Sequence, residues 1–199
     1  MISGMNHCVM KNQIRTFIAV PLSAAVRGAV EKLIRTFRQE LNGVQWVDMR
    51  NLHITLKFLG DVPMNELHRV IAAVQRGAES AQMFDLEFRG CGAFPNSQEP
   101  RTLWIGTDVG SKKLTATATT IENELFKLGF PKEHRRFTPH LTIGRVKRTA
   151  QAPDHVSRLL AEHSRQQFGS CGVDEVVVYS SELTRSGPIY DELATVPLR

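Results

Sequence analysis

The strongest constraint on the fold of this chain is the internal duplication of a short strand that contains a histidine. Residues 53–56 (HITL) match residues 140–143 (HLTI) at an offset of 140 − 53 = 87. Residues 15–20 (RTFIAV) resemble residues 101–106 (RTLWIG) at an offset of 101 − 15 = 86. Chance accounts for one such match, but two matches at nearly the same offset favour a duplicated strand–helix–strand unit.

The rest of the sequence has the patterns of an α+β domain. Apolar side chains recur at helical spacing in four segments, and shorter alternating segments between them predict strands. The predicted helices are 24–41, 64–77, 114–128 and 153–167. We expect a single domain over residues 14–199, built from repeat units at about 14–94 and 101–185, with residues 1–13 as a flexible N-terminal extension.

The two histidine strands have the same arrangement of faces. Side chains alternate across a strand, so His53, Thr55 and Lys57 share one face, and the apolar side chains between them share the other. The same alternation places His140 and Thr142 together on one face of the second strand. If the two units pack about a pseudo-twofold axis, both His/Thr pairs line one cleft.

Two facing imidazoles suit proton transfer, because one ring can take a proton from an attacking oxygen while the other gives a proton to a leaving oxygen. The hydroxyls of Thr55 and Thr142 can donate hydrogen bonds to a phosphate oxygen. We therefore expect in-line phosphodiester chemistry on a reactive cyclic phosphate, without a metal. A lone histidine on a strand is usually structural, but two matched motifs favour the catalytic interpretation.

The duplicated motifs resemble the HxTx pair of the two-histidine (2H) phosphoesterase superfamily. With Trp46, residues 137–140 (FTPH) and residues 181–183 (SEL), the chain resembles more narrowly the RNA 2′,3′-cyclic phosphodiesterases, also called 2′-5′ RNA ligases of the LigT/ThpR type. The resemblance covers about residues 14–198. It implies an α+β bilobal fold with two pseudo-symmetric lobes, each with an antiparallel sheet and outer helices around a central cleft.

The resemblance also implies the reaction. RNA with a 2′,3′-cyclic phosphate end, including tRNA fragments, is hydrolysed to a 2′-phosphate without cofactor, and some members join RNA ends through a 2′-5′ linkage. We assign His140 as the general base toward water and His53 as the general acid toward the 3′ oxygen. The near-symmetry of the motifs leaves the reversed assignment open.

Four other side chains are candidates for substrate binding. Lys57 shares a face with His53, so its ammonium could approach the phosphate. The resemblance implies a phosphate contact for Arg145, which strict alternation places on the wrong face unless the strand bulges at Gly144. Arg136 is a candidate contact for the RNA backbone, and Phe17 is a candidate for stacking on a base.

Composition excludes several other classes of protein. The chain has 199 residues and a formal charge of +5, with no apolar run near the ~20 residues of a membrane span. Its three widely spaced cysteines form no zinc motif or disulfide framework, and no nucleotide-binding GxxxxGK[ST] motif is present. We expect a cytoplasmic monomer that contacts no membrane and binds no metal or cofactor.

Two alternatives stay open at this point. The same chemistry could act on small cyclic nucleotides, on ADP-ribose cyclic phosphate or on 2′-5′ oligonucleotides. The chain could also be a module that binds RNA ends without turnover, although such a module has no need for two matched proton carriers.

Overall fold

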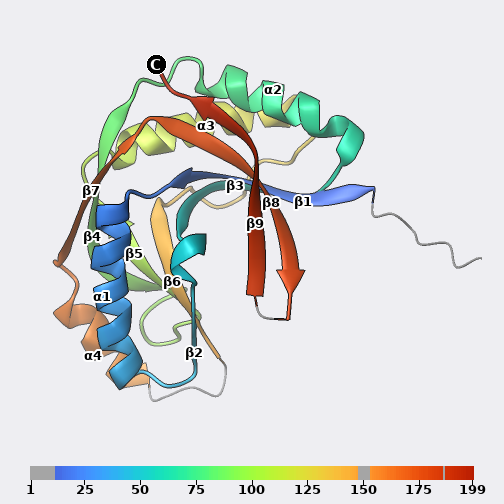
Figure 1. The fold of residues 1–199 in the computed structure, drawn as a ribbon. Coiled ribbons are helices and arrows are strands. Elements are labelled where there is room, and N and C mark those ends of the chain that lie inside the picture. Colours follow the sequence, from blue (N-terminus) through green and yellow to red (C-terminus); the bar gives the residue numbers. More distant parts are fainter. Residues whose placement is uncertain (1–11, 148–152, 186) are drawn as a thin grey trace, which may run out of the picture.

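The computed structural model describes residues 12–147, 153–185 and 187–199. Within these ranges the chain forms two antiparallel sheets and four α-helices, which confirms the expected α+β class (Figure 1). Of the predicted N-terminal extension, residues 1–11 lie outside the described residues, and Gln13 already belongs to the first strand.

One sheet has four strands and the other has five. The four-stranded sheet has the order β3 (His53–Pro63), β1 (Gln13–Pro21), β8 (Glu175–Thr184) and β9 (Gly187–Pro197). The five-stranded sheet has the order β2 (Val44–Trp46), β6 (His140–Val146), β5 (Thr102–Thr107), β4 (Phe84–Phe94) and β7 (Gln167–Val173).

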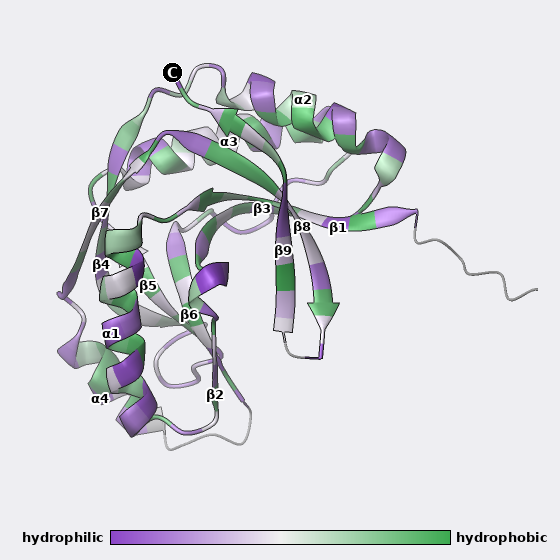
Figure 2. Cartoon of the chain, in the orientation of Figure 1, coloured by the Kyte–Doolittle hydropathy of each residue, from purple (hydrophilic) through white to green (hydrophobic). Residues whose placement is uncertain are grey.

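The helices cover one face of each sheet. Helices α2 (Leu67–Ala78) and α3 (Ser111–Phe126) pack side by side over the four-stranded sheet, whereas α1 (Ala24–Glu40) contacts β7 and α4 (Pro153–Glu162) contacts β4 (Figure 1). Two short 3₁₀ helices, η1 (Met49–Asn51) and η2 (Met64–Glu66), precede β3 and α2. In Figure 2 hydrophobic and hydrophilic colours alternate along α1 and α2, as expected for helices with one buried face.

The sheets do not coincide with the repeat units. Strands β2 and β4 belong to the first unit, but they pair with β6 and β5 of the second unit. Helix α1 follows β1 of the four-stranded sheet but packs against β7 of the five-stranded sheet. Helix α3 follows β5 of the five-stranded sheet but contacts β3 of the four-stranded sheet. The two units are therefore interleaved, which the duplication alone did not predict.

Each histidine strand contains a β-bulge at the same place in its unit. On β3, Thr55 pairs with Ala19 and Lys57 pairs with Ile18, so Leu56 is an extra residue. On β6, Thr142 pairs with Trp104 and Gly144 pairs with Leu103, so Ile143 is the extra residue. The bulges lie 143 − 56 = 87 residues apart, and beyond each of them the alternation of faces is reversed.

Candidate active site

The ring of each motif histidine is held by the carbonyl group two residues before it. His53 Nδ1 lies 2.8 Å from the carbonyl oxygen of Asn51, and His140 Nδ1 lies 2.7 Å from that of Thr138. A carbonyl oxygen can only accept a hydrogen bond, which assigns the proton of each neutral ring to Nδ1. Both Nε2 atoms therefore carry the lone pair that a general base needs.

The threonines lie where strand alternation predicts them. Thr55 Oγ1 is 3.0 Å from His53 Nε2, to which its hydroxyl donates when the ring is neutral. Thr142 is half-buried on the same face of β6 as His140, because their partners on β5, Trp104 and Gly106, are two residues apart. Each unit thus presents an imidazole and a hydroxyl on one face of its sheet.

Burial determines the protonation of both histidines. Burial lowers the pKa of His53 to about 4. The hydrogen bond to the Asn51 carbonyl raises this pKa in part, and the charge of Arg27 lowers it further. Burial also lowers the pKa of His140, which the bond to the Thr138 carbonyl partly offsets. Both rings are neutral at pH 7 in the free protein, and a bound phosphate anion favours their protonation.

Phe17 supports His53 and is not available to stack on a base. Its ring centroid lies 4.9 Å from that of His53 and 4.8 Å from that of Tyr190, and it stacks on Tyr179 at 5.2 Å. The side chain is only 2% exposed. The predicted stacking of a base on Phe17 is therefore wrong, because the ring is buried against His53, Tyr179 and Tyr190.

The second histidine has an aromatic support that the sequence reasoning missed. The centroid of Phe94 lies 4.9 Å from that of His140, and Trp104 lies 6.5 Å from it. The indole of Trp104 packs against Gly92, where a Cβ atom would collide with it. The pairing of β5 with β6 places this ring on the histidine face, because Trp104 lies opposite Thr142.

Lys57 lies on the opposite face from the one that simple alternation predicted. Because of the bulge it pairs with Ile18 on the helix-covered face, where it is only 4% exposed. Its Nζ donates to Glu122 Oε1 at 2.8 Å and to the carbonyl oxygen of Pro131 at 2.9 Å. Lys57 is therefore a buried structural cation, and the prediction that it approaches the phosphate is wrong.

The bulge on β6 has the opposite effect on Arg145. This residue pairs with Thr102, so it points to the same face as Trp104, Thr142 and His140. Burial raises the pKa of Tyr190, and the charges of Arg145 and Arg15 partly offset that rise. The ring centroid of Tyr190 lies 5.4 Å from that of His53, so the charge of Arg145 acts on the aromatic cluster around the first histidine. Arg136 is exposed in the loop before β6, and its contact with RNA stays a prediction.

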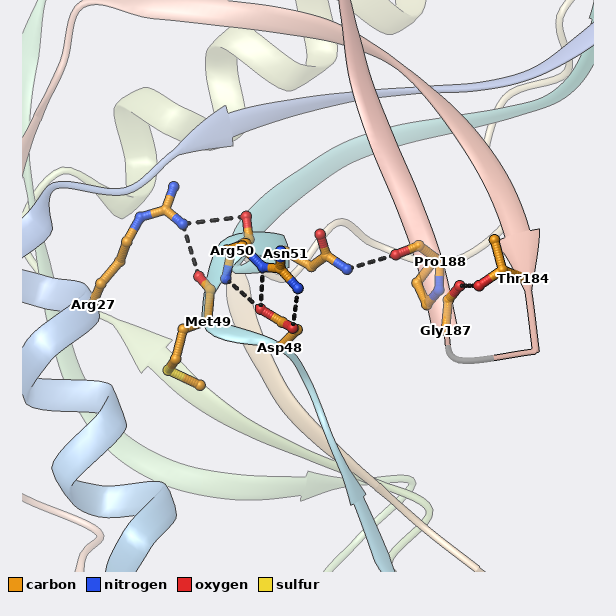
Figure 3. Close-up of polar contacts among 8 residues, drawn as sticks. All are labelled: Arg27, Asp48, Met49, Arg50, Asn51, Thr184, Gly187 and Pro188. Carbon is orange, nitrogen blue, oxygen red and sulfur yellow. Dashed lines mark hydrogen bonds and ion pairs between the residues drawn. The ribbon is translucent and has the colours of Figure 1, made fainter.

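The loop before His53 is tied to two other elements (Figure 3). The guanidinium of Arg27 in α1 donates to the carbonyl oxygens of Met49 at 2.8 Å and Arg50 at 3.3 Å. Asn51 Nδ2 donates to the carbonyl oxygen of Pro188 in the β8–β9 hairpin at 2.8 Å. These contacts hold in place the carbonyl group of Asn51 that orients His53.

Replacing Arg27 with methionine should therefore loosen the loop and lower kcat by about tenfold. The pKa of His53 should rise at the same time, because the charge of Arg27 contributes to its depression. Kinetics and an NMR titration of the His53 ring would check both effects. Arg50→Met is the matched control, since the guanidinium of Arg50 is exposed and binds Asp48 beside the same loop. An unchanged His53 titration in the Arg27 variant would contradict this role.

A cavity of about 320 Å³ adjoins the segment that orients His140. Thr138 and Pro139 form one wall, and Trp104, Thr107 and Ser111 form others.

In the described part of the chain, no three histidine, cysteine, aspartate or glutamate side chains cluster closely enough to hold a metal ion. None of the helices described is long and apolar enough to cross a membrane.

Comparisons with known proteins agree on one family. The sequence model of the 2'-5' RNA ligase superfamily matches residues 23–185 of this chain. A Methanothermobacter thermautotrophicus protein named RNA 2',3'-cyclic phosphodiesterase is 35% identical over 181 residues, which are 91% of this chain and 97% of that protein. An Archaeoglobus fulgidus protein of the same name is 38% identical, over 90% of this chain and 98% of that protein.

Solved structures have the same fold. A Thermus thermophilus protein superimposes with a TM-score of 0.77 at 29% identity, over 94% of this chain and 98% of the other. The structure of E. coli LigT complexed with 3'-AMP gives a TM-score of 0.73 at 23% identity with the same coverage. At that identity, the likeness to LigT shows the fold alone.

Proposed function

Because the chain belongs to the 2'-5' RNA ligase superfamily, we propose that it hydrolyses the 2′,3′-cyclic phosphate at the end of an RNA to a 2′-phosphate. The observation that carries this proposal is the pair of histidines, each with Nδ1 held by a carbonyl two residues before it. This arrangement leaves two Nε2 atoms for proton transfer. Relatives that are more than 30% identical over most of this chain bear the name of that activity.

In the reaction, a water oxygen attacks phosphorus and the bond from phosphorus to the 3′ oxygen breaks. One Nε2 takes the proton of the water, and the other imidazolium gives its proton to the 3′ oxygen, which leaves as a hydroxyl. Thr55, Thr142 and Arg145 are proposed to hold the phosphate oxygens. No step needs a metal ion, and replacing the water by a hydroxyl of a second RNA end gives 2′-5′ joining.

The surroundings of the two rings support the reversed assignment of acid and base. Burial lowers the pKa of His53 to about 4, and the charge of Arg27 adds to this decrease. His140 has no arginine among the groups that shift its pKa. We therefore propose His53 as the general base and His140 as the general acid, contrary to the assignment made from the sequence.

A product assay tests the function. The protein is incubated, in excess EDTA, with an oligoribonucleotide that ends in a 2′,3′-cyclic phosphate, and the 2′- and 3′-phosphate products are separated. A 2′-phosphate made by the unmodified protein and not by the His53→Ala/His140→Ala variant is the expected result. Absence of product would contradict the proposal. If that RNA still bound, the result would favour the binding module.

The pH dependence of the reaction should follow from the burial of His53 and His140. Catalysis needs one neutral and one protonated imidazole, and both pKa values lie below the ordinary 6.5 in the free protein. The bell-shaped profile of kcat/KM should therefore peak on the acidic side of pH 6.5. The profile of kcat should lie at higher pH, because the bound phosphate anion raises both pKa values. A kcat/KM optimum above pH 7 would contradict this prediction.

A further inference from the structure

The tip of the β8–β9 hairpin extends the face that carries His53. The pairing of β1 with β8 ends at Thr16 and Ser180, so among the described strands the last residues of β8 pair with β9 alone. Figure 1 shows this part of the hairpin projecting beyond the four-stranded sheet. The projection is tied to the site, because Asn51 Nδ2 donates to the carbonyl oxygen of Pro188 at 2.8 Å (Figure 3). The hairpin is therefore an arm that leads away from the first histidine.

One face of this arm continues the histidine face. Tyr190 lies opposite Ser181, and its ring centroid is 5.4 Å from that of His53. Leu183 is two residues beyond Ser181 and opposite Pro188, so its side chain shares this face. It lies about 7–8 Å from Tyr190 along the diagonal of the strand pair, and it is 67% exposed. We call Tyr190, Pro188 and Leu183 the hairpin track.

Positive charges flank the hairpin track. Arg15 lies two residues before Phe17 on β1, so its exposed side chain points to the same face. Arg145 points to the histidine face of the other sheet. Burial raises the pKa of Tyr190, and the charges of Arg145 and Arg15 partly offset that rise, so both charges act on the track. Asp61 lies opposite Arg15 on β3, but no ion pair joins these two described side chains.

A single strand of RNA has the complementary chemistry. Its phosphates are anionic and suit a guanidinium, and its unpaired bases present flat faces to apolar side chains. One exposed leucine is common on a protein surface, but Leu183 continues a half-buried aromatic ring beside a reacting histidine. A cyclic mononucleotide has no phosphate beyond the one that reacts, so only a longer chain can use both features.

We propose that the hairpin track binds the nucleotide on the 5′ side of the one that carries the cyclic phosphate, with its base against Leu183 and the linking phosphate near Arg15. The proposal rests on the proposed function and deepens it, because it makes the substrate an RNA chain rather than a mononucleotide. The contact has little sequence preference, since every base has such a face.

The first test compares adenosine 2′,3′-cyclic phosphate with a trinucleotide that ends in the same group. The unmodified protein should have a kcat/KM roughly tenfold higher for the trinucleotide. Leu183→Ala should lower the trinucleotide value about three- to tenfold and leave the mononucleotide value unchanged. Ile189→Ala is the matched control, because Ile189 is 50% exposed on the same hairpin but lies opposite Glu182, on the other face.

A second substitution tests the charge. Arg15→Gln should lower kcat/KM for the trinucleotide about tenfold and reduce the slope of its logarithm against that of the salt concentration by about 0.7. A trinucleotide whose last linkage is an uncharged methylphosphonate should be cleaved equally well by Arg15→Gln and by the unmodified protein. Arg38→Gln is the control, because it removes the same charge from an exposed position on α1.

The outcomes distinguish this inference from the proposed function. Equal kcat/KM values for the two substrates, equal losses on both in Leu183→Ala, or equal effects of Leu183→Ala and Ile189→Ala would overturn the track and leave the hydrolytic function in place. Failure to cleave either substrate would contradict the proposed function. Fluorescence anisotropy with a trinucleotide that ends in a 2′-phosphate tests the track without turnover. Leu183→Ala should weaken this binding about three- to tenfold, and unchanged binding would overturn the track.

Discussion

Replacing either His53 or His140 with alanine should lower kcat on a 2′,3′-cyclic phosphate RNA end by about 10²–10⁴-fold. Each ring is expected to carry one of the two proton transfers, because each has its Nδ1 held by a carbonyl and its lone pair on Nε2. A second variant at each position, His53→Gln or His140→Gln, keeps most of the side-chain volume. It separates the loss of the proton carrier from a loss of packing against Phe17 or Phe94.

Single-turnover cleavage of a labelled oligoribonucleotide measures this loss, and calorimetry confirms that the variants are folded. Full activity in both alanine variants would mean that the two-histidine mechanism is wrong.

A substrate with a better leaving group should separate the two roles. When sulfur replaces the 3′ oxygen of the cyclic phosphate, the leaving group no longer needs a proton from the general acid. His140→Ala should then recover most of its activity, whereas His53→Ala should stay inactive, because water still needs a base. Recovery of His53→Ala instead would restore the assignment that was made from the sequence.

Replacing Lys57 with methionine should lower the free energy of unfolding by about 3 kcal/mol, although the catalytic groups stay in place. Methionine fills a similar volume, but the variant leaves the Glu122 carboxylate without the ammonium that binds it at 2.8 Å. In a domain of this size, such a loss corresponds to a fall in Tm of roughly 6–12 °C. Calorimetry of the variant measures it.

The double variant Lys57→Met/Glu122→Gln is the control, because it removes both charges and should recover much of the lost stability. Its kcat should equal that of the unmodified protein. A Lys57→Met protein with unchanged Tm and lost activity would show instead that this ammonium contacts the substrate, as simple alternation predicts.

The ion pair between Lys57 and Glu122 makes the stability of the protein depend on pH. Burial alone would raise the pKa of Glu122, but the hydrogen bonds from Lys57 and from the backbone N–H of Glu133, together with nearby lysine charges, lower it below the ordinary 4.5. A carboxyl with a depressed pKa stabilises the fold above its unfolded pKa and loses this effect as the pH falls through its folded pKa. The difference in stability between the unmodified protein and the double variant should therefore shrink below pH 4.5.

The local part of the site could be predicted from the sequence. Alternation over three residues places His53 with Thr55 and His140 with Thr142, and the structure has both pairs on common faces. Beyond the bulges the same rule placed Lys57 and Arg145 on the wrong faces. A bulge depends on how a strand pairs with its neighbour, so alternation within one segment does not contain it.

The aromatic residues of the site could also be predicted from the sequence only in part. Phe17 was recognised as part of the site, but its burial by Tyr179 and Tyr190 depends on β8 and β9, which lie more than 150 residues later in the sequence. Phe58 lies two residues beyond the first duplicated motif, yet only the register between β1 and β3 turns its ring toward the histidine face. Likewise, the contacts of Arg27 and Asn51 that hold the loop before His53 come from α1 and β9.

The sequence by itself determined the duplication, the α+β class and the two His/Thr pairs, because repeats and short-range alternation are properties of contiguous residues. The tertiary structure alone decided that the units exchange strands and helices, that two bulges bury Lys57 and turn Phe58 and Arg145 toward the histidines, and which carbonyl holds each ring. Those features depend on pairing between segments far apart in the chain. Such pairing is set by the packing of the whole molecule rather than by the pattern of any one segment.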